Sequence, residues 1–136
     1  MVSREKIQEL IALAQKAREK AYAPYSKYPV GAAVLFDGGK IYTGCNIENA
    51  SYGLANCGER TAIFKGVSEG EKEIMAIAIS VQGDTPGTPC GACRQVIREF
   101  GPKALVISAA ENGKYLSWTL EELLPESFGP EFLAGS

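Results

Sequence analysis

Apolar residues in the first part of the chain recur with the spacing of a helix. They follow the i, i+3, i+4, i+7 pattern at Ile7, Leu10, Ile11, Ala14, Ala17 and Ala21. Ser3 precedes this run, and a serine hydroxyl can accept a hydrogen bond from an N–H group of the first helical turn. The pattern predicts an amphipathic helix over residues 4–21.

Two short runs of β-forming residues follow the helix-breaking Pro24 and Pro29. The runs are Val30–Phe36 and Ile41–Cys45, and the sequence Asp-Gly-Gly-Lys joins them at residues 37–40. Strands joined by a short glycine-containing linker are typical of a hairpin. We therefore expect two antiparallel strands here.

The rest of the chain alternates between helical and strand-like patterns. The predicted elements are a helix over 58–67, a buried strand over 74–81, a helix ending at 100, a strand over 104–108, a short strand over 115–118 and a helical turn over 120–124. Such alternation after an initial hairpin predicts an α/β sandwich in which helices cover both faces of one mixed sheet. A length of 136 residues fits a single domain over residues 1–136.

The absence of histidine is the composition's most restrictive feature. It excludes Ser-His and Cys-His nucleophile pairs and every histidine metal ligand. The net charge of −2 provides no general attraction for phosphates, so we expect no nucleic-acid polymer as a partner. Any metal site must use Cys, Asp or Glu.

The four cysteines, Cys45, Cys57, Cys90 and Cys93, have two interpretations. They could form two disulfides in an exported protein, or they could be thiols in a reducing compartment. The N-terminal MVSREK carries charge with no apolar segment after it, and no apolar run approaches the roughly 20 residues that cross a bilayer. We therefore expect a cytoplasmic protein with no membrane partner.

Three of the cysteines fall at predicted helix N-termini. Cys57 begins the motif Cys-Gly-Glu-Arg, and Cys90 and Cys93 belong to the motif Pro-Cys-Gly-Ala-Cys. The free N–H groups and partial positive charge of a helix N-terminus stabilise thiolates, the form of cysteine that binds zinc. Three thiolates leave the fourth tetrahedral position open, as in catalytic rather than structural zinc sites. We expect one zinc ion per subunit.

Glu59 is the candidate catalytic residue beside this metal. Residues two apart on a helix point about 200° away from each other, so Cys57 and Glu59 converge only if Cys57 is the non-helical cap residue. A carboxylate in that place could accept a proton from water activated by the zinc and deliver it elsewhere. Arg60 and Arg94 are the cations that could offset the thiolate charge, and we expect Arg60 to donate to a thiolate rather than form a surface ion pair.

The cysteines have two simpler interpretations. One is a redox Cys-x-x-Cys, and the other is a closed structural site in which Cys45 is the fourth zinc ligand. The combination Cys-x-Glu with Pro-Cys-x-x-Cys is more specific, because His-x-Glu with Pro-Cys-x-x-Cys is the signature of zinc deaminases, in which three cysteines can also serve. Cys57 takes the histidine position here, and we expect Cys45 to be the buried end of a strand.

Over nearly its whole length the sequence resembles the short, zinc-dependent cytidine deaminases that act on free nucleosides. Besides the cysteine motifs, the resembling segments are residues 23–27, 30–33, 44–50, 123–125 and 128–130. The resemblance implies a five-stranded sheet between helices, a three-layer α/β/α sandwich. It also implies a homotetramer in which neighbouring subunits share active sites.

The resemblance also implies roles for residues that contact the substrate. Asn46 and Glu48 would bind ribose hydroxyls, Tyr28 would line the base and sugar pocket, and Phe128 would stack on a neighbouring subunit's substrate. Tyr28 and Gly58 depart from the family, which commonly has Phe and Ala there, although the Gly58 N–H can still serve the substrate. Simpler roles are an Asx-type turn at residues 46–48, core packing of Tyr28 and an interfacial Phe128.

These features predict hydrolytic deamination of cytidine and deoxycytidine to uridine and deoxyuridine, a step of pyrimidine salvage that releases ammonia. The nearest alternative activity is deamination of an aminopyrimidine antibiotic, against which the Asn46 and Glu48 pair argues. From a different class, a non-catalytic zinc module with Cys45 as fourth ligand would leave Glu59 without a role.

Overall fold

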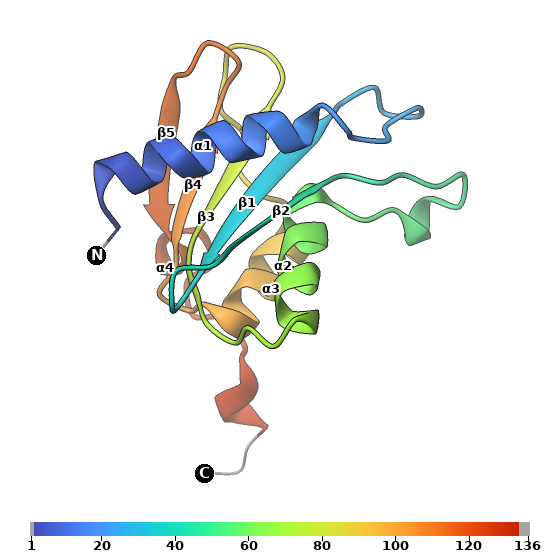
Figure 1. Cartoon of the computed structure of the whole chain (residues 1–136). Coiled ribbons are helices and arrows are strands. Elements are labelled where there is room, and N and C mark those ends of the chain that lie inside the picture. The colour runs from blue at the N-terminus through green and yellow to red at the C-terminus, as the bar shows by residue number, and fades with distance from the viewer. Residues whose placement is uncertain (1, 134–136) are drawn as a thin grey trace.

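The computed structural model describes residues 2–133, in which helices flank a five-stranded sheet (Figure 1). The predicted outer boundaries of the domain, residues 1 and 136, lie outside the described residues. In chain order the elements are α1 (Arg4–Arg18), β1 (Val30–Phe36), β2 (Ile41–Cys45), η1 (Tyr52–Leu54), α2 (Gly58–Ser68), β3 (Ile74–Val81), α3 (Gly91–Phe100), β4 (Leu105–Ala109), β5 (Tyr115–Thr119), α4 (Leu120–Leu123) and η2 (Pro130–Phe132).

The sheet is mixed and has the strand order β2-β1-β3-β4-β5. Strands β3 and β4 are parallel, as the intervening helix α3 requires, and the other neighbours are antiparallel. The predicted hairpin of β1 and β2 is confirmed, and Gly38 and Gly39 at its turn both have φ of +100°. Glycine suits both positions because it alone enters this region without steric cost.

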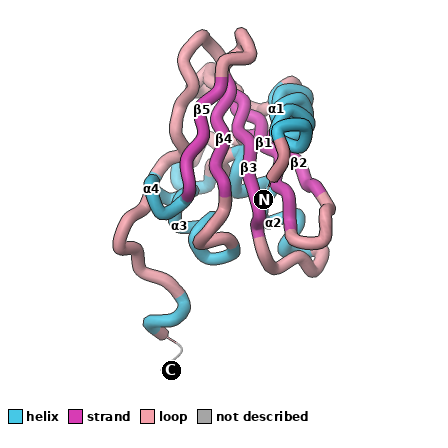
Figure 2. The backbone as a smooth tube through the Cα atoms, turned by 90° about the vertical axis from the view of Figure 1, so that its left-hand side faces the viewer, coloured by secondary structure: helices cyan, strands magenta, loops and turns pink. Residues whose placement is uncertain are grey.

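Two apolar cores lie on opposite faces of the sheet and make a three-layer sandwich. Helix α1 covers one face, and helices α2 and α3 cover the other (Figures 1 and 2). The buried helix residues of the two cores are Leu10, Ile11 and Ala14 from α1, Ala62 and Ile63 from α2, Ile97 from α3 and Leu120 from α4. The predicted α/β class is thus confirmed. None of the helices in the described part of the chain has the length and hydropathy that a bilayer crossing needs.

Small residues let the helices approach the sheet closely. A Cβ atom on Gly31 in β1 would overlap the carbonyl oxygen of Ala14 and the backbone nitrogen of Arg18 in α1. On the other face, a Cβ on Gly44 in β2 would lie 2.6 Å from the backbone nitrogen of Ala62 in α2. Close packing at Gly44 fixes α2, and therefore its N-terminus, against the sheet.

The element boundaries differ from prediction mainly at the end of the first helix. Helix α1 stops at Arg18, three residues before the predicted end at Ala21. The chain is diverted because Tyr22 donates its N–H to the Asn46 carbonyl and accepts from the Glu48 N–H, at 3.0 and 2.9 Å. A long-range backbone pairing, which local periodicity does not reveal, ends the helix.

We predict that Gly31→Ala destabilises the protein strongly, because the added methyl group meets backbone atoms of α1 that cannot rotate away. Overpacking of this kind costs about 1–3 kcal/mol or more of unfolding free energy. Gly53→Ala is the matched control, since a Cβ there meets nothing within 4 Å. Thermal denaturation monitored by circular dichroism checks this, and equal melting temperatures for the two variants would contradict it.

Candidate metal centre and adjoining cavity

The two cysteine motifs begin the two helices that share one face of the sheet. Cys57 is the N-cap residue of α2, with φ −73° and ψ 155°, and Cys90 is the N-cap residue of α3, with φ −67° and ψ 167°. Both are in extended conformation, and neither side chain caps its own helix. Both sulfurs therefore remain available, and Cys57 has the non-helical geometry that convergence with Glu59 requires.

The structure brings the sulfurs of Cys57, Cys90 and Cys93 together. Their Sγ atoms all lie within 4.8 Å of one another, and those of Cys90 and Cys93 are 3.5 Å apart. Two sulfurs on one tetrahedral zinc, each about 2.3 Å from the metal, would lie about 3.8 Å apart. The donor set and its spacing therefore fit zinc. Within residues 2–133, Cys45 does not belong to the group; it ends β2 and is partly rather than fully buried.

Hydrogen bonds favour the thiolate form of Cys57. Donation from Cys93, and then from Arg60, lowers the pKa of Cys57 to about 5, and Arg60 Nη2 lies 3.2 Å from its Sγ. The same contact with Cys57, together with burial, raises the pKa of Cys93. Of these two thiols, Cys93 therefore holds its proton more firmly, and metal binding would release it. Arg60 lies where the sequence analysis expects it.

The other candidate cation, Arg94, has its hydrogen bonds with groups other than the sulfurs. Its guanidinium donates to the Pro89 carbonyl at 2.8 Å, to Thr88 Oγ1 at 2.9 Å and to the Leu123 carbonyl at 2.7 Å. Of the two candidate cations, Arg60 and not Arg94 therefore donates to a thiolate. Its contacts instead fix the loop that leads into Cys90 to the end of α4.

Glu59 lies in the first turn of α2 and is only 5% exposed. Burial raises the pKa of its carboxyl group, and the neighbouring Cys57 thiolate acts in the same direction. Both effects disfavour the ionised form. A carboxyl group in this setting can hold a proton and pass it to another group.

A cavity of about 310 Å³ adjoins the cysteines, a volume within the range of small-molecule sites. Its lining comes from segments 26–30, 46–48, 57–59, 79–81 and 87–90. Glu59, Cys57 and Cys90 therefore share one cavity with the expected substrate-binding residues Tyr28, Asn46, Glu48 and Gly58. Segments far apart in the sequence meet here at one end of the sheet.

Asn46 and Glu48 are both engaged with the segment before β1. The Asn46 side chain accepts from the Val30 N–H at 2.9 Å and donates to the Tyr28 carbonyl at 3.0 Å. Glu48 accepts from the N–H groups of Tyr25 and Ser26, at 3.0 and 3.1 Å, and from the Ser26 hydroxyl. These are long-range bonds, not the Asx-type turn considered from sequence.

These contacts lower the pKa of Glu48, chiefly through the Ser26 hydroxyl, so the carboxylate is ionised. Ser26 and Thr88 also line the cavity, and they are its two polar side chains that were not expected as site residues from the sequence. Ser26 belongs to a segment of the family resemblance, 23–27, which was the available signal. For Thr88 the sequence offers none beyond its position two residues before Cys90.

Phe128 does not line this cavity. Its side chain is 56% exposed and stacks on Phe132, with ring centroids 5.4 Å apart and an interplanar angle of 18°. Phe132 is itself 64% exposed. The structure of a single chain therefore leaves Phe128 outside the cavity of its own subunit.

Comparisons with known proteins agree with this geometry. Residues 4–109 match the family model described as the cytidine and deoxycytidylate deaminase zinc-binding region. The cytidine deaminase of Sporosarcina psychrophila is 48% identical over 129 residues, covering 94% of this chain and 95% of that protein. The cytidine deaminase of Halalkalibacterium halodurans is 49% identical over 125 residues, covering 91% and 95%.

Solved structures show the same likeness. The crystal structure of cytidine deaminase from Burkholderia pseudomallei superposes with a TM-score of 0.85 at 47% identity, covering 89% of this chain and 98% of that one. The structure from Mycobacterium tuberculosis gives a TM-score of 0.78 at 37% identity, covering 91% and 98%.

We predict that Cys45→Ser retains one zinc per chain, whereas Cys57→Ser, Cys90→Ser and Cys93→Ser each bind zinc weakly or not at all. Only the last three remove a sulfur from the cluster. Metal content after dialysis, measured by atomic emission, checks this. Equal loss of zinc from all four variants would show a closed four-cysteine site.

Proposed function

The chain belongs to the cytidine and deoxycytidylate deaminase family of zinc-binding proteins, and we propose that it hydrolyses cytidine and deoxycytidine to uridine and deoxyuridine. The observation that carries this proposal is the shared cavity: a buried carboxyl group, three clustered thiols and the Asn46 and Glu48 side chains meet in or beside it. A non-catalytic zinc module would have no use for a buried acid there.

Cys57, Cys90 and Cys93 would hold the zinc. When bound, the metal supplies a Lewis acid that lowers the pKa of water to near neutrality. Three thiolates donate electron density and oppose that effect. The Arg60 guanidinium and the N-termini of α2 and α3 offset the thiolate charge, because both place positive charge at the sulfurs.

Glu59 would carry the protons. It accepts one from the attacking water, whose oxygen adds to carbon 4 of the cytosine ring, and donates it to ring nitrogen 3. It then takes the remaining proton from the hydroxyl group on carbon 4 and gives it to the exocyclic amine, which leaves as ammonia as the carbon 4 carbonyl forms. The raised pKa of the buried carboxyl group supports this role, because proton exchange is efficient when the pKa approaches the working pH.

Asn46, Glu48, Tyr28 and the Gly58 N–H would position the nucleoside. A carboxylate offers about four acceptor sites, of which Tyr25 and Ser26 occupy three at Glu48. One site remains for a substrate hydroxyl. Glu48 would therefore accept a hydrogen bond from one ribose hydroxyl in a fixed direction. It would not bind both hydroxyls of the ribose by itself.

The active form would be a homotetramer with shared sites, in which Phe128 reaches a neighbouring subunit's cavity. Exposed aromatic side chains support this, because Phe128 and Phe132 would be covered on assembly. The cytoplasmic location expected from sequence stays part of the proposal, since three close thiols must remain reduced to bind metal.

We predict that Glu59→Gln lowers kcat for cytidine by at least about 10²-fold while zinc content stays at one per chain, because the amide keeps the shape but cannot accept a proton. The loss of cytidine absorbance and the release of ammonia measure the reaction. Glu121→Gln, an exposed carboxylate on α4, is the control and should match the parent. A Glu59→Gln rate within tenfold of the parent would exclude Glu59 as the proton carrier.

We also predict that the parent sediments as a tetramer and that Phe128→Ala raises the KM for cytidine about tenfold with unchanged zinc content. Aromatic stacking on a base contributes about 1–3 kcal/mol in single-stranded nucleic-acid binding, and 1.4 kcal/mol corresponds to tenfold. Sedimentation velocity and steady-state kinetics check this. A monomer that works at full rate, or an unchanged KM, would contradict shared sites.

A further inference from the structure

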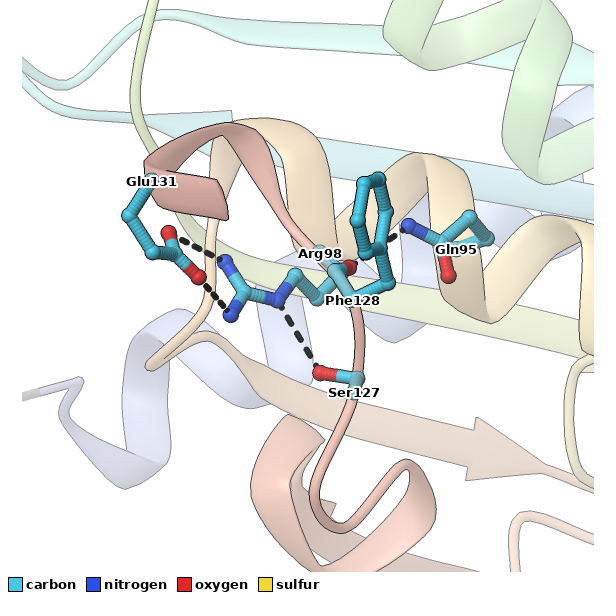
Figure 3. Close-up of polar contacts among 5 residues, drawn as sticks. All are labelled: Gln95, Arg98, Ser127, Phe128 and Glu131. Carbon is cyan, nitrogen blue, oxygen red and sulfur yellow. Dashed lines mark hydrogen bonds and ion pairs between the residues drawn. The ribbon is translucent and has the colours of Figure 1, made fainter. Parts of the chain in front are cut away.

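The segment that follows α4 is attached to α3 through two polar side chains. Gln95 Nε2 donates to the Phe128 carbonyl at 3.0 Å, and Arg98 Nε donates to Ser127 Oγ at 3.0 Å (Figure 3). Gln95 and Arg98 are three residues apart and so lie on one face of the helix. This face of α3 holds the backbone on both sides of Phe128.

The Arg98 guanidinium also forms a two-pronged ion pair with Glu131. Nη1 lies 3.2 Å from Oε2, and Nη2 contacts Oε1 (Figure 3). The Arg98 side chain is only 15% exposed, and its contact with Glu131 lowers the pKa of that carboxyl. Two parallel hydrogen bonds between a planar guanidinium and a carboxylate fix the orientation of the two groups as well as their separation. A lysine ammonium would not fix that orientation.

The backbone between these contacts bends closely around the guanidinium. A Cβ atom on Gly129 would overlap Nη1 and Cζ of Arg98, so the arginine occupies the space of an absent side chain. Residues 127–131 thus surround Arg98, with Ser127 and Glu131 binding it and Gly129 packed against it. Few apolar contacts replace this attachment, since Phe128 and Phe132 are mostly exposed.

We propose that Arg98, together with Gln95 and Glu131, is a positioning residue that fixes the direction in which the Phe128 ring projects from the surface of its subunit. The inference rests on the proposed function in one respect, namely that Phe128 contributes to substrate binding in a neighbouring cavity. Arg98 does not line the cavity beside the cysteines of its own subunit. It therefore acts on substrate affinity only through Phe128.

Steady-state kinetics on the zinc-loaded full chain test the functional part. Arg98→Gln should raise the KM for cytidine about tenfold, with kcat within about twofold of the parent and one zinc per chain. Arg98→Lys should recover part of the affinity, because it keeps the charge but loses the fork. Arg4→Gln, an exposed arginine on α1, is the matched control and should match the parent.

The double variant distinguishes positioning from general destabilisation. Because Arg98 acts through Phe128, Arg98→Gln combined with Phe128→Ala should have the KM of Phe128→Ala alone. A parental KM for Arg98→Gln, or a double variant whose KM rises by the product of the two single effects, would overturn the inference. Absence of cytidine turnover in the parent would instead refute the proposed function.

Hydrogen exchange tests the attachment without any activity. The N–H groups of Phe132 and Leu133 bond to the carbonyls of Gly129 and Pro130 at 3.1 and 3.0 Å. Arg98→Gln and Glu131→Gln should each accelerate exchange at these two amides about tenfold, while buried amides of β3 keep the parental rate. Parental exchange at Phe132 and Leu133 in both variants would overturn the inference.

Discussion

Two helix N-termini meet over the same face of one sheet, and the chemistry of this chain depends on that meeting. Each helix starts with a cysteine in extended conformation, so Cys57 and Cys90 direct their sulfurs toward the same point while Cys93 joins from the first turn of α3. The positive ends of both helices and the Arg60 guanidinium then surround three groups that bind zinc only as anions. The sheet and its close helix packing keep these ends in place.

The same geometry separates the roles of two carboxyl groups in one cavity. Glu59 is buried beside a thiolate, and its pKa is raised; Glu48 accepts three hydrogen bonds from Tyr25 and Ser26, and its pKa is lowered. The raised pKa suits Glu59 to accept and release a proton, as the proposed mechanism requires, whereas Glu48 stays ionised and can accept a further hydrogen bond. Environment rather than residue type distinguishes them.

The sequence predicts features that depend on neighbouring positions. Cys-x-Glu and Pro-Cys-x-x-Cys each lie at one helix start, and hydrophobic periodicity predicts both starts. Local sequence patterns do not predict that Arg94 bonds to Leu123, or that Arg98 bonds to Ser127 and Glu131. Those partners lie about 30 residues away along the chain. Helix α1 likewise ends early through pairing of Tyr22 with residues beyond β2.

The most direct test of this account is the number of sulfur atoms around the metal. X-ray absorption at the zinc edge of the zinc-loaded protein measures it independently of activity. Convergence of the two helix N-termini predicts three sulfurs at about 2.3 Å, with the fourth position open to a lighter ligand. Four sulfurs would mean that Cys45 completes a closed structural site, and two or fewer would mean that the helix N-termini do not form the metal centre.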